Sequence, residues 1–207
     1  MRNLFRTLAA VALLGATTSC GDVVRNGRAS SYLVIDSLAG IRGAVSAATP
    51  ASTLVSDVIT NVTSPPPCTQ TTPCPTIFGD SGQAVMHIAL KNAGTATTPA
   101  TPSEVNAITI TRYHVDYVRA DGLNTPGVDV PYGFDGAVTV TVSGATTFGF
   151  QLVRVVAKEE APLVQLRFSN SFITVLARVT FYGHDQAGNE VTASGSIQID
   201  FGNYGDF

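Results

Sequence analysis

Residues 172–201 read FITVLARVTFYGHDQAGNEVTASGSIQIDF, and this stretch decides the fold. Every second residue from Ile173 to Phe181 is apolar, whereas three of the four residues between them are threonine or arginine. The same alternation returns from Val191 to Phe201, with serine, glutamine and aspartate in between. Period-two patterning of this kind predicts strands with one buried and one solvated face. The six residues 184–189 contain Gly and Asn, which suit a turn, so the stretch predicts an antiparallel hairpin.

Further strands are indicated on the N-terminal side of this hairpin. Segments rich in Val, Ile, Thr, Tyr and Phe recur between clusters of Gly, Pro, Asn and Asp, as strands do between turns. Including the hairpin, we expect strands near residues 31–38, 54–60, 84–91, 106–119, 137–142, 148–156, 163–168, 172–183 and 190–201.

Two local features modify this pattern. In 106–119, Ile108 and Ile110 share one parity but Tyr113 and Val115 share the other, which predicts a β-bulge near residues 111–112. The segment around Val155 to Pro162 favours a short helical turn, because residues 157–161 have helical propensity and Pro162 would end the turn. Without helices long enough for crossovers, the strands predict an all-β fold, an antiparallel sandwich of about eight or nine strands in a single domain at 31–207.

The segment from Tyr182 to Val191 resembles the last hairpin of many bacterial immunoglobulin-like domains, in which an Asp, a Gly-Asn turn and a following Val recur. The segment has ten of the 207 residues of the chain. The resemblance extends to the sandwich architecture only, because the chain has no Trp and its internal cysteines are close together.

The N-terminus has the three parts of an export signal. Arg2 and Arg6 precede the apolar run 8–16, which is far too short to span a membrane, and small residues follow at 17–19. Residues 17–21, TTSCG, resemble the lipobox of bacterial lipoproteins, although Thr17 stands where the family usually has Leu. The alternative is an ordinary secretory peptide with an incidental cysteine.

The resemblance implies a signal peptide at 1–19, a Cys20 that is lipidated on sulfur, and a short tether at 20–30. Two acyl chains suffice for stable anchoring, where one is marginal. Because Gly21, and not Asp, follows the cysteine, the resemblance also implies an exported protein anchored to the outer membrane and contacting the membrane through its lipid.

The charge balance argues against one class of partner. Twelve Lys and Arg face fifteen Asp and Glu, a net charge of −3, and loss of residues 1–19 would leave ten basic residues against the same fifteen acidic ones. A protein that binds nucleic acid must neutralise several phosphates, so we expect no nucleic-acid partner.

Two cysteines remain once Cys20 is assigned to lipid. Cys68 and Cys74 lie in the proline-rich segment 65–75, PPPCTQTTPCP. An even number of cysteines in an exported chain predicts a disulfide, here a local one on an exposed loop. Free thiols are the alternative, because zinc and thioredoxin-like sites require other spacings.

One tetrapeptide resembles a catalytic motif. Residues 79–82, GDSG, are similar to the nucleophile segment of chymotrypsin-like serine proteases, which implies Ser81 as a nucleophile. That family has a further Gly where Gln83 stands, and its upstream histidine motif is missing, so a turn entering strand 84–91 is the preferred interpretation.

The histidines and turn acids indicate no cofactor or metal. His87, His114 and His184 have no metal spacing, although His114 and Asp116 could orient one another on one strand face. The turns at 121–124 and 185–190 offer too few oxygen atoms for calcium. Four aromatic residues could form a sugar platform but are better explained as core: Tyr113, Tyr117, Tyr132 and Phe134.

These observations predict a lipid-anchored lipoprotein of the cell envelope that is not an enzyme. Its β-sandwich would serve as a structural or protein-interaction module for an envelope protein that the sequence does not identify. The alternatives are a protein that binds a small ligand or glycan and, third, a hydrolase using Ser81.

Overall fold

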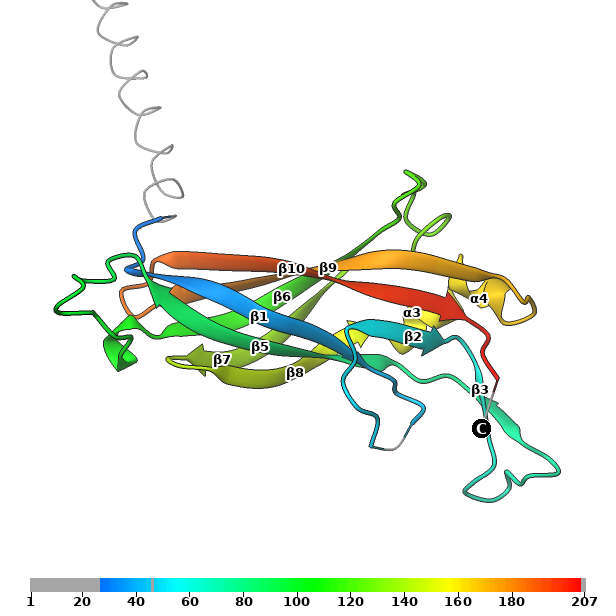
Figure 1. The fold of residues 1–207 in the computed structure, drawn as a ribbon. Coiled ribbons are helices and arrows are strands. Elements are labelled where there is room, and N and C mark those ends of the chain that lie inside the picture. The colour runs from blue at the N-terminus through cyan, green and yellow to red at the C-terminus, as the bar shows by residue number, and fades with distance from the viewer. Residues whose placement is uncertain (1–26, 46, 206–207) are drawn as a thin grey trace, which may run out of the picture.

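The computed structural model describes residues 27–45 and 47–205 of the chain, which form a β-sandwich (Figure 1). The predicted signal peptide and Cys20 lie outside these residues. The described residues contain two facing sheets, a separate two-stranded sheet and three short helical segments. In chain order the elements are β1 (Ser31–Ile41), β2 (Thr53–Asp57), β3 (Thr60–Val62), β4 (Cys74–Thr76), β5 (Asp80–Leu90), η1 (Glu104–Asn106), β6 (Ile108–Val118), β7 (Phe134–Val142), β8 (Thr146–Val153), α3 (Val155–Glu159), α4 (Leu163–Leu166), β9 (Phe172–Asp185) and β10 (Glu190–Gly202).

The predicted hairpin is confirmed as β9 and β10. The two strands pair antiparallel without interruption from His184 opposite Glu190 to Phe172 opposite Gly202. At the turn, the Asp185 carboxylate accepts hydrogen bonds from the backbone N–H groups of Ala187 and Asn189, each at 2.9 Å. Gly188 adopts a φ of 79° there, a conformation that glycine reaches without a steric penalty. The hairpin forms the centre of the larger sheet, whose strand order is β2-β10-β9-β6-β7.

The bulge predicted in the long strand is also confirmed. The register of β6 shifts between Ile110 and Arg112 against both of its neighbours, β7 and β9. The extra residue turns Tyr113 and Val115 to the same inner face as Ile110, and all three side chains are buried.

The expectation of a purely antiparallel sandwich is wrong at one edge. β2 pairs with β10 in parallel, from Thr53 opposite Gln198 to Asp57 opposite Gly202. The larger sheet is therefore mixed, while the smaller sheet, β1-β5-β8, is antiparallel throughout. Because β2 and β10 are far apart in the chain, no local sequence pattern could predict that they pair.

The strand predicted at 163–168 is wrong, because this segment forms helix α4. Leu163 and Leu166 are buried, a spacing of three that fits one helical turn and not a strand. The predicted strand 148–156 ends at Val153, and the helical turn predicted around Val155 to Pro162 is confirmed as α3, which begins at Val155. The predicted strand 54–60 is divided between β2 and β3.

The core lies between the two sheets and contains aromatic rings from both. Tyr113 of β6 meets Phe150 of β8 edge to face at 5.3 Å between ring centroids, and Phe150 meets Phe181 of β9 at the same distance. Such edge contacts add to the apolar burial that holds the layers together. The Tyr117 hydroxyl also crosses the core and donates to the Leu152 carbonyl oxygen at 2.7 Å.

Candidate functional site

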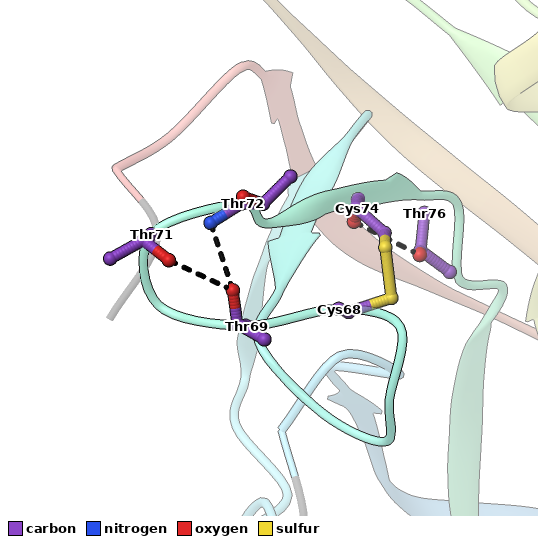
Figure 2. Close-up of a disulfide and its surroundings, with 6 residues drawn as sticks. All are labelled: Cys68, Thr69, Thr71, Thr72, Cys74 and Thr76. Carbon is purple, nitrogen blue, oxygen red and sulfur yellow. Dashed lines mark hydrogen bonds between the residues drawn. A yellow bond between two sulfur atoms is a disulfide. The ribbon is translucent and has the colours of Figure 1, made fainter.

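The predicted disulfide is present between Cys68 and Cys74, whose Cα atoms are 5.3 Å apart (Figure 2). It closes a loop in which the Thr72 backbone N–H donates to the Thr69 hydroxyl oxygen at 3.0 Å. Residues 63–73 are exposed apart from the partly buried Cys68, as expected of a proline-rich loop. The position of Cys74 differs from the expectation, because it begins β4, opposite Val62 of β3. The bond therefore closes the end of a small two-stranded sheet.

Ser81 is not brought into contact with any of the three histidines. It lies within β5, which begins at Asp80, so the predicted turn at 79–82 is wrong. His87 is six residues further along the same strand, about 20 Å away. Nδ1 of His87 instead lies 2.8 Å from a carboxylate oxygen of Asp36, and Nδ1 of His184 lies 3.2 Å from the Asp185 carbonyl oxygen. The structure thus places none of these histidines as a general base beside the Ser81 hydroxyl.

His114 lies between two carboxylates on the outer face of the larger sheet. Its Nε2 is 3.0 Å from Asp116 on the same strand, as its spacing suggested, and its Nδ1 is 2.9 Å from Asp135 on β7. Burial alone would lower the pKa of His114, but the hydrogen bonds to Asp135 and Asp116 outweigh it and raise the pKa. The described residues hold no group of three or more acidic, histidine or cysteine side chains arranged for a metal ion.

The aromatic residues considered as a sugar platform do not form one. Tyr113, Tyr117 and Phe134 are buried in the core, and only Tyr132 is exposed. The carboxylate of Asp185 at the β9–β10 turn likewise accepts its hydrogen bonds from within the protein. Burial opposes ionisation of Asp185, but the hydrogen bonds from Asn189 and Ala187 prevail and hold its pKa below the ordinary value.

A buried ion pair that the sequence did not reveal lies at one end of the sandwich. Nζ of Lys158 in α3 is 2.8 Å from Oδ2 of Asp80, with side chains only 1% and 3% exposed. Lys158 also donates to the Asp57 carbonyl oxygen at 2.8 Å. Asp80 accepts further bonds from the Ser56 hydroxyl at 2.6 Å and the Gly43 N–H at 2.9 Å. Burial lowers the pKa of Lys158, and Asp80 offsets part of this effect. Because the Lys158 and Asp80 side chains are almost fully buried, the cluster joins elements in the interior of the sandwich.

A groove opens at the other end of the sandwich, beside the start of β1 in one sheet and the start of β10 in the other. It consists of two adjoining cavities of about 330 and 440 Å³. Both are lined by Arg112, Tyr182 and Glu190, and the larger one also by Tyr32 and Lys91. We call this feature, defined by these five residues, the seam groove. Sequence patterning could not reveal it, because its residues come from four separate segments.

Exposed apolar side chains gather around the start of β9. Phe168, in the connection from α4 to β9, is 92% exposed, and Phe172 and Leu176 on β9 are 68% and 45% exposed. Exposed aromatic residues that are close together are typical of surfaces that meet a partner. Phe172 stands in the predicted strand, but its exposure, four residues after an exposed loop phenylalanine, was not expected.

Comparison with known proteins gave no relative from which a role could be transferred. The chain matches no protein-family model, and neither a curated protein nor a solved structure is significantly similar to it. Among the described residues, no helix is long and apolar enough to cross a membrane.

Proposed function

We propose that the protein is a lipid-anchored envelope lipoprotein whose β-sandwich acts as a structural or protein-interaction module. The anchoring part rests on the TTSCG segment with Cys20. The interaction part rests on one observation, the exposed phenylalanines Phe168 and Phe172.

The placement of these phenylalanines supports the proposal. The end of the predicted tether and the start of β1, Gly27 to Ser31, lie near the β9–β10 turn, since Ser31 and Val191 line the same cavity. Phe172 is at the opposite end of the 14-residue strand β9, about 45 Å away. Figure 1 shows this arrangement, with the start of β1 and helix α4 at opposite ends of the sandwich. An anchor at one end would thus present the exposed phenylalanines away from the bilayer.

We further propose that the sandwich is immunoglobulin-like. The strand order supports this: β1-β5-β8 corresponds to A-B-E, and β10-β9-β6-β7 corresponds to G-F-C-C′ of variable-type domains. In this correspondence β6 is strand C, which carries the buried Trp in antibody domains. Tyr113 and Tyr117 of β6 are buried in the core.

The anchor is tested by incorporation of labelled fatty acid into the wild type and Cys20→Ser. We expect label in the wild type only, and equal label in both, or none in either, would refute the anchor.

The interaction is tested by recovering partners from envelope extracts with the wild type, Phe168→Ser and the matched control Leu123→Ser. Leu123 is exposed but lies in another loop. We expect Phe168→Ser alone to lose a partner that the wild type recovers, and recovery by all three proteins would contradict the role of the phenylalanines.

The seam groove favours a second candidate function, the binding of a small ligand. Its combined volume is within the range of ligand sites, and aromatic and charged side chains converge on it.

A further inference from the structure

The seam groove holds charged groups that the protein does not neutralise. The Arg112 guanidinium stacks on the Tyr182 ring at 3.8 Å from the ring centroid. The Lys91 ammonium lies 5.0 Å from the Tyr32 ring centroid and donates to the Gly27 carbonyl oxygen at 2.6 Å. Within residues 27–45 and 47–205, neither cation forms an ion pair with a carboxylate.

Glu190 contributes the opposite charge to the same groove. Its carboxylate forms no ion pair with Arg112 or Lys91, although all three residues line one cavity. The groove therefore offers two cationic groups and, separately, one anionic group. A ligand with only a negative charge would leave Glu190 unpaired and repelled, whereas a ligand carrying both charges would satisfy all three residues.

The cations are also held in position. Stacking on Tyr182 covers one face of the Arg112 guanidinium and leaves its N–H edge available, the geometry in which arginine binds phosphate through two hydrogen bonds. The floor of the groove is preformed by buried residues, including Ala29 and Val191. The ring contacts of Arg112 and Lys91 and the hydrogen bond of Lys91 already restrict the side chains of both cations before a ligand binds, which favours affinity.

We propose that the seam groove binds a zwitterionic phosphoethanolamine group, with the phosphate at Arg112 and Lys91 and the ammonium at Glu190. Such a group occurs free or as the head group of a membrane lipid. The lipid source rests on the proposed anchoring: Gly27 is the seventh residue after Cys20, so a fully extended tether between them spans at most about 25 Å. The groove, which Gly27 borders, would then lie within reach of the lipid head groups.

The experiment uses the full chain carrying Cys20→Ser, so that no acyl anchor contributes. Binding is measured by calorimetry with O-phosphoethanolamine, inorganic phosphate and ethanolamine. Co-sedimentation is measured with vesicles of phosphatidylglycerol alone and of phosphatidylglycerol with phosphatidylethanolamine. Arg112→Gln and Glu190→Gln are compared with Arg178→Gln, a control on the outer face of the same sheet, and circular dichroism checks that each variant is folded.

We expect O-phosphoethanolamine to bind more tightly than phosphate or ethanolamine. Loss of a charge-assisted hydrogen bond should weaken this binding about tenfold in Arg112→Gln and in Glu190→Gln, and Arg178→Gln should bind as well as the parent. Vesicles containing phosphatidylethanolamine should retain more protein than vesicles of phosphatidylglycerol alone. This additional retention should be smaller for Arg112→Gln and Glu190→Gln and unchanged for Arg178→Gln.

The experiment can overturn the groove as the site and, separately, the lipid as the source of the ligand. Absence of binding to O-phosphoethanolamine, or binding that Arg112→Gln leaves unchanged, would show that the groove is not the site. Binding of free O-phosphoethanolamine with equal retention on both kinds of vesicle would refute the lipid source. Neither result depends on acylation of Cys20, which the fatty-acid labelling tests separately.

Discussion

The Lys158 ammonium and the Asp80 carboxylate form an ion pair in the interior, 2.8 Å apart, although 77 residues separate them in the sequence. The pair connects α3 to the first residue of β5, and the bond from Lys158 to the Asp57 carbonyl oxygen adds the end of β2. Three segments from different parts of the chain thus depend on one ammonium group. A buried ion pair adds little to the free energy of unfolding when it is compared with apolar side chains in the same place. Removal of only one partner, however, leaves an unpaired buried charge, which destabilises the folded state strongly.

We therefore expect Lys158→Met to lower the free energy of unfolding by about 3 kcal/mol. Methionine fills much of the lysine volume, so the loss reports mainly the unpaired Asp80 carboxylate. Urea denaturation measures the change, with the exposed Lys91→Met as the control, for which we expect a change within about 0.5 kcal/mol. Equal stability of the two variants would show that the pair does not support the fold.

Tyr117→Phe removes the hydroxyl that joins β6 to β8 across the core. The Leu152 carbonyl oxygen would lose a buried donor at 2.7 Å, so we expect a loss of about 1–2 kcal/mol in the free energy of unfolding. Tyr32→Phe is the matched control, because the Tyr32 ring is mostly exposed. A Tyr117→Phe variant as stable as the control would indicate that the bond is replaced without cost.

Two measurements test the disulfide and its contribution to stability. Without reductant, mass spectrometry should find Cys68 joined to Cys74, and two alkylatable thiols would contradict the bond seen here. Replacing both cysteines with serine should lower stability by about 2 kcal/mol, because the bond restricts a short loop in the unfolded chain. Thermal denaturation of the oxidised wild type and the double variant measures this loss.

His114 gives the stability of the protein a pH dependence. Its pKa is raised in the folded state, so the folded state binds the proton more tightly than the unfolded chain. The resulting stabilisation is fully present below the unfolded pKa of about 6.5 and is lost as the pH rises through the higher folded pKa.

NMR titration of the His114 ring measures that folded pKa directly. Asp135→Asn should lower it towards the unfolded value, because one of the two carboxylate partners is removed. Asp121→Asn, a change in the loop after β6, is the control. An unchanged titration in Asp135→Asn would show that the two carboxylates do not determine the proton affinity.

The sequence predicted the fold best where the deciding interactions are local. Alternation located β9 and β10, and the change of parity after Ile110 located the bulge in β6. The short segment around Leu163 was assigned to a strand because four to six residues are too few to separate the two periodicities. The parallel pairing of β2 with β10 joins residues almost 150 apart, so no local pattern could indicate it.

The same distinction applies to the candidate sites. Cys68 and Cys74 are close in sequence, and their pairing followed from counting cysteines. Asp80 was considered only as a neighbour of Ser81, and Lys158 only as part of a helical turn, because a buried ion pair is defined by packing. The seam groove likewise exists only after both sheets have assembled.

The position of β10 in the larger sheet also constrains the order in which the protein can acquire its structure. β10 follows all other described strands in the chain, yet it lies in the sheet interior, between β2 and β9. During synthesis or threading from the N-terminus, β2 has no hydrogen-bonded sheet partner until residues 198–202 emerge. The strands β1, β5 and β8, and likewise β6, β7 and β9, can pair with one another earlier, but β2 can join the larger sheet only when β10 is present, so completion of this sheet is a late step that depends on a contact between distant residues.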